Sequence, residues 1–288
     1  FRSDRDYTGN TSAFWHHGRL YALREDSIPM ELDPVTLETR GYASFRPQLK
    51  TKTMTAHPKI DPVTGEWWSY GQYCHKEYRR EMARTVFDKA GNLVRQEELV
   101  MPYNGVCHDF VMTRDYAVFT VMPLTVDVAR LKAGGDFYAW DPSLQPMYGV
   151  MPRSGTTKDI RWFEVPGAMI AHFMNAWNEG GKLFIDGFAA PGNSFGFFND
   201  VNCKPTPNAV ADSKLTRVTI DLGRADGKAE LRGFDKAIGE MPKMDERHAL
   251  KTYRYGWHKT FDGIAMVDWQ TGEHKVHQLL KTENPGVS

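Results

Sequence analysis

The sequence predicts an all-β fold built from repeated units of several short antiparallel strands, as in a β-propeller or a related β array. Alternating apolar stretches dominate the chain, and long stretches with helical periodicity are nearly absent. Aspartate-containing turns separate these stretches at residues 33–37, 61–65, 88–92, 221–227 and 268–272. Aspartate caps such a turn through its carboxylate, and glycine takes the positive φ that closes a hairpin. Strand and turn signals therefore agree on repeated β units.

A third observation is a local pattern that occurs three times with a histidine at the same point. The copies begin at His57, His108 and His172, and each continues through a short extended segment and a polar turn to an apolar strand. Repeated units present equivalent side chains toward one shared place. Three converging imidazoles predict a metal site suited to Fe, Zn, Cu or Ni. The equivalent positions of the first and last units are expected at Asn10 and near Phe261–Asp262, so the repeat itself does not require histidine.

Two segments, 124–158 and 189–213, look like long insertions between strands of the units. Long insertions on one face of a repeat array commonly carry binding function, so both are expected to form walls of an active site. Phe110, Phe173 and the run Phe195–Phe198 are candidates for the aromatic surface that holds a flat substrate. Aromatic residues at such positions are more often part of a hydrophobic core.

Composition narrows the function classes. The 288 residues carry a formal net charge of zero, and no basic stripe predicts nucleic-acid binding. No apolar run approaches the roughly 20 residues that span a bilayer, and no secretory leader is recognisable. Cys74, Cys107 and Cys203 are widely spaced, which predicts free thiols in a reducing, cytoplasmic compartment. A homodimer is compatible with these properties.

The remaining seven histidines are expected to be structural or to face solvent. They are His16, His17, His75, His248, His258, His274 and His277. His16 and His17 adjoin a turn, which favours exposure. His274 and His277 are three residues apart, and in a strand this spacing places them on opposite faces. The same alternation makes Cys107 a poor co-ligand beside His108.

Four segments carry a resemblance to the carotenoid cleavage oxygenase family. They are residues 55–62 (Thr-Ala-His-Pro-Lys-Ile-Asp-Pro), residues 102–110 (Pro-Tyr-Asn-Gly-Val-Cys-His-Asp-Phe), residues 160–163 leading to His172, and residues 240–247. Residues 140–144 and 152–153 are also similar to the family. The order and spacing of the segments are specific, and the resemblance covers essentially the whole chain. Within the family, the chain most resembles the lignostilbene dioxygenase-like branch.

The resemblance implies a seven-bladed β-propeller with Fe(II) bound on its axis by four histidines. His57, His108 and His172 match three of these ligands. Glu25 and Glu240 match two glutamates that orient ligand imidazoles, although by the residues alone both are typical of surface charges. The family's fourth histidine lies beyond any segment matched here. Residues 1–288 are therefore expected to be an incomplete catalytic propeller domain of roughly five blades.

The activity implied by the resemblance is cleavage by O2 of the central C=C bond of a phenolic stilbene into two aldehydes. Arg24 occupies the position of a lysine that, in the stilbene-cleaving branch, helps to hold the phenolic hydroxyl. Its planar fork keeps the positive charge of that lysine, but a surface arginine is an equal interpretation. The alternatives are cleavage of a carotenoid or apocarotenoid, a zinc or copper hydrolase or oxidase, and a non-catalytic propeller platform.

Overall fold

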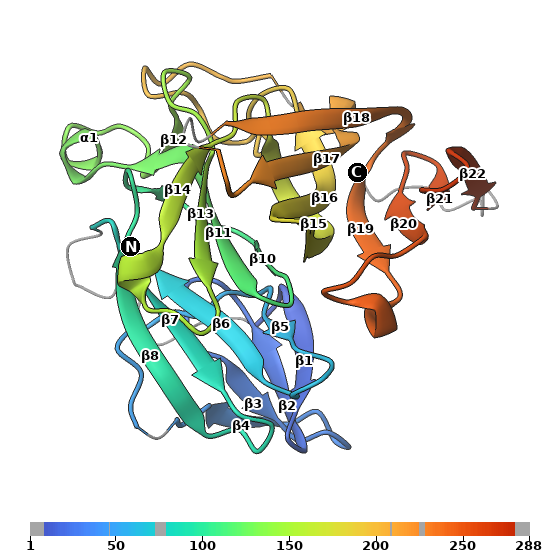
Figure 1. Ribbon diagram of the computed structural model, residues 1–288. Helices are drawn as coiled ribbons and strands as arrows, with labels where there is room; N and C mark the ends of the chain where they lie inside the picture. Colours follow the sequence, from blue (N-terminus) through green and yellow to red (C-terminus); the bar gives the residue numbers. More distant parts are fainter. Residues whose placement is uncertain (1–8, 46, 73–78, 208, 225–227, 280–288) are drawn as a thin grey trace.

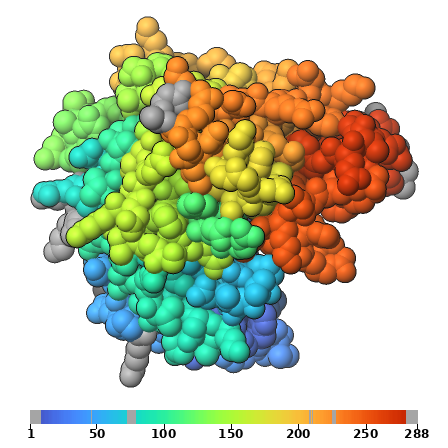
Figure 2. All heavy atoms as spheres, in the orientation of Figure 1, coloured from blue at the N-terminus to red at the C-terminus, as the bar shows by residue number. Residues whose placement is uncertain are grey.

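Five antiparallel sheets follow one another in chain order in the computed structural model, which describes residues 9–45, 47–72, 79–207, 209–224 and 228–279. Figure 1 shows the sheets arranged around an arc, with the first strand of each toward its inner side. In Figure 2 the first two sheets (blue to cyan) form the lower part of the molecule, and the third and fourth (green to orange) form the upper part. The predicted all-β array of about five blades is confirmed. The closed seven-bladed form and the domain limits 1–288 stay predictions.

Each sheet has a strand order that follows the sequence. The first contains β1 (Ser12–His16), β2 (Arg19–Leu23), β3 (Met30–Leu32) and β4 (Thr39–Tyr42). The second contains β5 (Lys59–Ile60), β6 (Trp67–Gln72), β7 (Glu81–Phe87) and β8 (Leu93–Val100). The third contains β10 (Phe110–Met112), β11 (Tyr116–Val126), β13 (Met147–Pro152) and β14 (Arg161–Glu164), with β9 (Gly105–Val106) and β12 (Tyr138–Trp140) also paired to β11. The fourth contains β15 (Met169–Glu179), β16 (Lys182–Ala190), β17 (Lys214–Asp221) and β18 (Ala229–Ile238), and the fifth contains β19 (Glu240–Met244), β20 (Tyr255–Lys259), β21 (Gly263–Asp268) and β22 (Glu273–Gln278).

Helices are confined to connections between strands: α1 (Val128–Lys132), η1 (Thr157–Asp159), η2 (Ala209–Asp212) and η3 (Glu246–His248). The prediction that 124–158 is wholly an insertion was wrong. This segment contains β13, which pairs with β11 from Met147 to Pro152 as the third strand of its sheet. Most of β13 is buried, so it lacks the polar alternation that marks a half-exposed strand. The second segment, 189–213, is a long connection after β16, as predicted.

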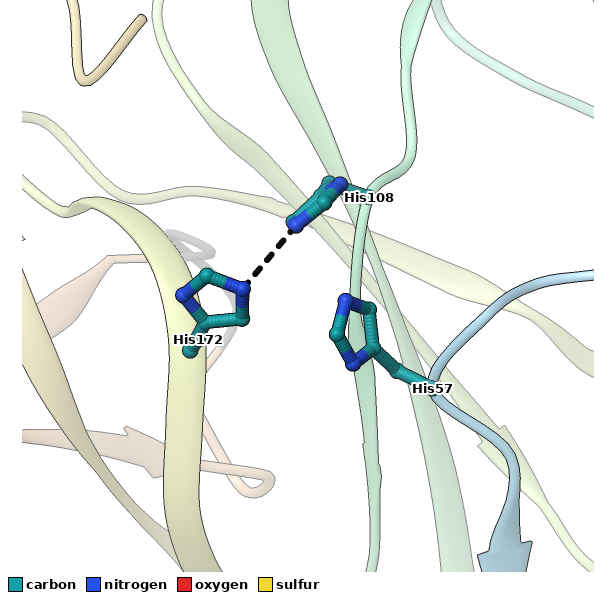
Figure 3. A group of neighbouring side chains, drawn as sticks. All are labelled: His57, His108 and His172. Atoms are coloured by element: carbon teal, nitrogen blue, oxygen red, sulfur yellow. Dashed lines mark hydrogen bonds between the residues drawn. The ribbon is translucent and has the colours of Figure 1, made fainter. Parts of the chain in front are cut away.

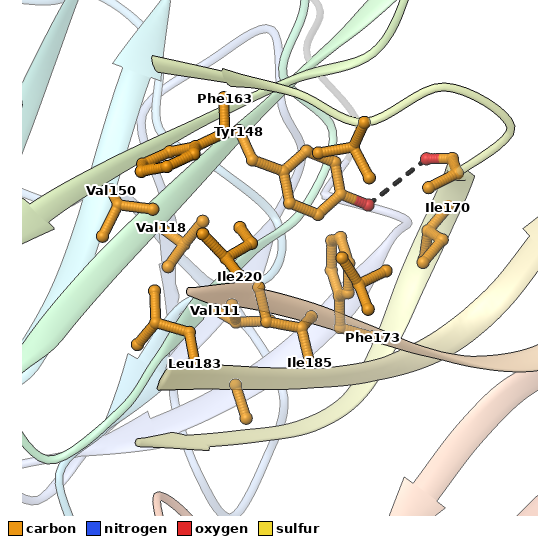
Figure 4. Packing of buried hydrophobic residues seen from close by; sticks show 14 residues of the cluster. Val111, Val118, Tyr148, Val150, Phe163, Ile170, Phe173, Leu183, Ile185 and Ile220 are labelled. Atoms are coloured by element: carbon orange, nitrogen blue, oxygen red, sulfur yellow. Dashed lines mark hydrogen bonds between the residues drawn. The ribbon is translucent and has the colours of Figure 1, made fainter. Parts of the chain in front are cut away.

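The hydrophobic core lies between the faces of neighbouring sheets. Figure 4 shows the largest cluster, in which side chains of the third sheet such as Val118 and Phe163 meet side chains of the fourth such as Leu183 and Ile220. Tyr148 belongs to this cluster and donates its hydroxyl to the carbonyl of Ala168 at 3.2 Å. Further clusters lie between the other neighbouring sheets. Because each sheet packs on its neighbour, the order of the sheets brings their first strands together.

The aspartate turns have the predicted chemistry but occupy two different places in the sheets. The Asp61 carboxylate accepts from the Val63 amide at 2.7 Å between β5 and β6. The Asp268 carboxylate accepts from the Gln270 amide at 2.9 Å between β21 and β22. Placing the equivalent position of the last unit near Phe261–Asp262 was therefore wrong. Phe261 is fully exposed between β20 and β21, and the first strand of this sheet begins at Glu240.

The packing between the third and fourth sheets predicts that Leu183→Ala lowers the free energy of unfolding by about 2–5 kcal/mol, through lost burial and a residual cavity. Leu183 is completely buried. Denaturant unfolding measures the change. The matched control is Leu231→Ala, whose side chain is 43% exposed, with an expected change within about 0.5 kcal/mol. Equal effects of the two substitutions would contradict the proposed core.

Candidate metal centre

His57, His108 and His172 come together where the first strands of the second, third and fourth sheets meet. His57 and His108 each precede the first strand of a sheet by two residues, and His172 lies within β15. Their ligand atoms all lie within 4.8 Å of one another. Figure 3 shows the three imidazoles facing one another, with 3.1 Å between Nε2 of His108 and Nε2 of His172. The convergence expected from the repeated pattern is present in the structure.

A break in the β15–β16 ladder positions His172. The register of β15 against β16 shifts between Ile170 and Phe173, on either side of this histidine. Such a bulge re-aims side chains within a strand. Gly187 on β16 permits the close approach, because a Cβ at that position would lie 2.6 Å from Ile170 and 3.0 Å from the His172 carbonyl oxygen.

Strand β6 fixes the segments that carry the other two histidines. The Tyr70 hydroxyl donates to the Cys107 carbonyl at 2.7 Å, and the Tyr70 carbonyl accepts from the Thr55 amide at 2.7 Å. Gln72 accepts from the Cys107 amide at 2.9 Å. His57 in turn donates its backbone N–H to the Thr55 hydroxyl at 3.0 Å. The buried strand β6 therefore holds the two backbone segments that carry His57 and His108 and lead into β5 and β10.

Two carboxylates contact the outer nitrogens of the imidazoles. Glu25, in the turn after β2, contacts Nδ1 of His108. Oε2 of Glu240 lies 3.0 Å from Nδ1 of His172. These contacts leave Nε2 of both histidines directed toward the shared centre, which is the arrangement that orients metal-binding imidazoles. Glu240 begins β19, at the inner end of the fifth sheet. The structure places both predicted glutamates beside the predicted ligands, and their catalytic roles stay predictions.

The surroundings of His57 and His108 act in opposite directions on the pKa values of these two imidazoles. Burial lowers the pKa of His57 to about 3, so this ring is neutral at physiological pH. Its Nε2 is buried and has no hydrogen-bond partner within the described residues. Burial opposes protonation of His108 as well, but the Glu25 carboxylate outweighs it and raises the pKa of His108. A buried nitrogen without a partner, beside the Nε2 atoms of two rings whose Nδ1 atoms contact carboxylates, fits a cation at the centre.

The other predicted site residues have mixed outcomes. The Arg24 guanidinium is partly exposed and lies 2.9 Å from the Asp26 carboxylate, so its role as a phenol anchor stays a prediction. Phe110 is completely buried between the second and third sheets, which makes it a core residue. Phe173 also packs in a core cluster. Phe195, from the long connection after β16, packs edge-on against His108 with ring centroids 5.2 Å apart.

The remaining histidines and cysteines confirm most expectations. His16 is an exception, because it is 7% exposed and its Nε2 lies 3.0 Å from the Gly65 carbonyl oxygen. Packing between the first two sheets buries His16 at the end of β1. His258 and His274 contact each other, with 3.1 Å between their Nε2 atoms. Cys107 is buried and Cys203 is exposed, both as free thiols. Cys74 and His75 lie outside the described residues.

Sequence reasoning assigned no role to Asp109 and Lys59, which form an ion pair beside the histidines. Nζ of Lys59 lies 2.7 Å from Oδ1 of Asp109, whose side chain is only 3% exposed. Burial would raise the pKa of Asp109, but Lys59, His57 and backbone N–H donors outweigh it and keep that pKa below its usual value. The sequence signal that could have indicated this pair is the position of Asp109, a charged residue between His108 and an apolar segment.

Two cavities differ in their relation to this centre. A cavity of about 550 Å³ follows the inner strands and is lined by His57, Lys59, Phe173 and Pro242 among others. A larger cavity of about 1100 Å³, lined by residues that include Trp68, Arg153 and Trp177, contains none of the three histidines. Of these two cavities, only the smaller one reaches the candidate centre, through His57.

A family model described as retinal pigment epithelial membrane protein, RPE65, matches residues 1–286. The chain belongs to the RPE65/carotenoid oxygenase family. It is 40% identical over 248 residues to isoeugenol monooxygenase of Pseudomonas putida, and the alignment covers 86% of this chain and 52% of that protein. It is 39% identical over 269 residues to lignostilbene-alpha,beta-dioxygenase isozyme III of Sphingomonas paucimobilis, with coverage of 92% and 55%.

The fold of this family member is shared with a solved relative. The crystal structure of Pseudomonas brassicacearum lignostilbene dioxygenase is similar with a TM-score of 0.90 and 31% identity, covering 96% of this chain and 62% of that one. The chain spans about half the length of the curated relatives it matches. None of the helices in the described residues has the length and apolar character needed to cross a bilayer. The cytoplasmic location and the homodimer stay predictions.

The neutral, buried state of His57 predicts a pH dependence of stability in metal-free protein. His57 has an ordinary pKa of 6.5 and a folded-state pKa of about 3. Below pH 6.5 the unfolded chain binds a proton that the folded protein does not, so stability falls as the pH falls from 6.5 toward 3. The contribution is at most about 1.4 kcal/mol per pH unit. Urea unfolding from pH 7 to pH 4.5 should show a shallower loss in His57→Gln than in the unsubstituted protein, and parallel curves would contradict this assignment.

Proposed function

We propose that this protein is a non-haem Fe(II)-dependent oxygenase that cleaves, with O2, the C=C bond conjugated to a phenolic ring. A phenolic stilbene of the lignostilbene type is the favoured substrate. The overall reaction adds both atoms of O2 across the broken double bond and releases two aldehydes. The observation that carries the proposal is the convergence of His57, His108 and His172, with Glu25 and Glu240 on the outer nitrogens of two of them.

The donor set supports iron. The three imidazoles would hold the ion as neutral ligands, through Nε2 of His108 and His172 and the buried Nε2 of His57. Iron bound in this way supplies an O2-activating centre, since it can exchange electrons with O2, which Zn²⁺ cannot. Glu25 and Glu240 accept the Nδ1 protons and keep the imidazoles oriented. Ligation by neutral nitrogens leaves the positive charge of the cation uncompensated within the ligand set.

An apolar wall beside the histidines supports an aromatic substrate. Phe195 packs against His108 and belongs to a cluster with Met122, Met169 and Trp140. Phe197 lies 5.9 Å from Phe195 between ring centroids and is 76% exposed. Such a surface binds flat rings and excludes water from the reacting double bond. Isoeugenol and lignostilbene, the compounds in the names of two relatives, are both aryl alkenes.

Arg24 is the proposed anchor for the phenol oxygen. It directly precedes Glu25, whose carboxylate contacts His108, so a substrate ring near Arg24 would lie close to the centre. Its guanidinium can donate charge-assisted hydrogen bonds to the single oxygen of a phenolate. An ionised phenol conjugated to the alkene increases the electron density of the double bond and makes it more reactive toward an oxidant.

Iron content tests the metal site. After anaerobic reconstitution with Fe(II), His108→Ala should lose most of the iron found by elemental analysis in the unsubstituted protein, because it removes a ligand. His277→Ala, which removes an exposed histidine of β22, is the matched control and should retain iron. Iron content should be measured both for this chain and for a form extended to the length of its relatives. Absence of iron from both would reject the oxygenase and leave a propeller platform.

Substrate comparison tests the anchor. Arg24→Ala should lower kcat/KM for a 4-hydroxystilbene by about tenfold to a hundredfold, the range for loss of a hydrogen bond to a charged group. The corresponding 4-methoxy compound, which cannot form a phenolate, should be much less affected. Arg19→Ala removes an arginine of the same sheet that pairs with Glu31 and serves as the control. Equal losses for both substrates in Arg24→Ala would refute the anchoring role.

A further inference from the structure

The buried carboxylate of Asp109 contacts the first strands of the second, third and fourth sheets, close to the three histidines. Its Oδ1 accepts from Nζ of Lys59 at 2.7 Å and from the backbone N–H of Phe110 at 2.7 Å. Its Oδ2 accepts from the backbone N–H of Phe173 at 3.1 Å. Lys59 and Phe110 are the first residues of β5 and β10, and Phe173 lies in β15.

These donors have a common relation to the histidines. Lys59 and Phe110 each follow a histidine by two residues, and Phe173 follows His172 directly. A single carboxylate, in the segment that carries His108, therefore links this segment to the side chain of Lys59 and to the backbone of Phe173. The bulge in β15 contributes to this link. It interrupts the β15–β16 ladder on both sides of Phe173, and the amide of Phe173 donates to Asp109.

We infer that Asp109, with Lys59, is a positioning element that fixes the separation of the three imidazoles before a metal binds. This inference rests on the proposed metal site and adds residues outside its ligands. Asp109 does not contact Nε2 of any histidine in the described residues, so it acts through the strands.

A buried ion pair contributes little net stability, so a positioning role accounts better for the Lys59–Asp109 pair. An isolated buried carboxylate is costly, and Lys59 together with the two amides compensates it. The pair is formally neutral, so it adds little net charge beside a dication. Holding ligands at their bound separation lowers the ordering cost of binding. Substitutions of groups that support metal ligands typically weaken metal affinity by about tenfold to a hundredfold.

The test is anaerobic calorimetric titration of the metal-free protein with Co(II), followed by the visible absorption spectrum of the bound ion. Asp109→Asn retains the shape of the side chain but has only one oxygen acceptor, so it cannot serve Lys59 and Phe173 together. It should bind Co(II) about tenfold or more weakly, with an altered spectrum. Lys59→Met should weaken binding as well, and Lys59→Arg should restore part of the affinity because it retains the charge.

Asp186→Asn is the matched control. Asp186 is completely buried and pairs with Arg217 at 2.8 Å in the fourth sheet. Within the described residues, its side chain bonds to Arg217 and Tyr253 and to no residue next to the three histidines. This variant should lower the thermal unfolding temperature and leave Co(II) affinity unchanged. If Asp109→Asn does not fold, the comparison of Lys59→Met with Lys59→Arg decides the question, since Lys59 is partly exposed.

Two outcomes separate this inference from the proposed function. If the unsubstituted protein binds Co(II) through the histidines, while Asp109→Asn or Lys59→Met binds it within twofold and with the same spectrum, the positioning role is wrong and the metal site stands. If the unsubstituted protein takes up neither Co(II) nor Fe(II), the proposed function and the inference built on it both fail.

Discussion

The face-to-face packing of neighbouring sheets is the constraint on which the rest of the structure depends. No sheet in the array can bury both faces alone, so each packs on its neighbour through clusters such as the one containing Val118, Phe163 and Leu183. This stacking brings β10 against β15 and β15 against β19. Residues far apart in the chain, such as His57 and His172, therefore meet at the inner edge. The candidate metal centre is a consequence of how the sheets stack.

Polar contacts add a second level of connection between the sheets. The Ser12 hydroxyl donates to the Ala56 carbonyl at 2.6 Å and links the first sheet to the second. Asp109 links the second, third and fourth sheets. The Tyr253 hydroxyl donates to the Asp186 carboxylate at 2.7 Å and links the fourth sheet to the segment before β20. Apolar packing tolerates small sliding, whereas directional hydrogen bonds specify one register between sheets.

Family membership and local geometry support different parts of the functional argument. The family relationship establishes the type of fold, and the relatives named above are a monooxygenase and a dioxygenase. The geometry explains how this chain prepares a cation site, through a buried neutral His57 and two imidazoles whose outer nitrogens face carboxylates. Phe195, in the proposed aromatic surface, packs against one of these histidines, His108. The proposed aromatic surface and the candidate metal centre therefore lie next to each other in the fold.

The sequence by itself determined the β units, the hairpin turns and the three histidines, because these depend on local alternation and on residues close in the chain. The match of Glu25 and Glu240 came from resemblance, since neither residue is near its imidazole in sequence. Only the tertiary structure decided that Phe110 is core and Phe195 faces the centre, because burial depends on which sheets become neighbours. It also decided that Glu240, rather than Phe261–Asp262, begins the fifth sheet, since one turn motif serves two places in a sheet. The Lys59–Asp109 pair joins residues 50 positions apart, and only the stacking of the sheets brings such residues together.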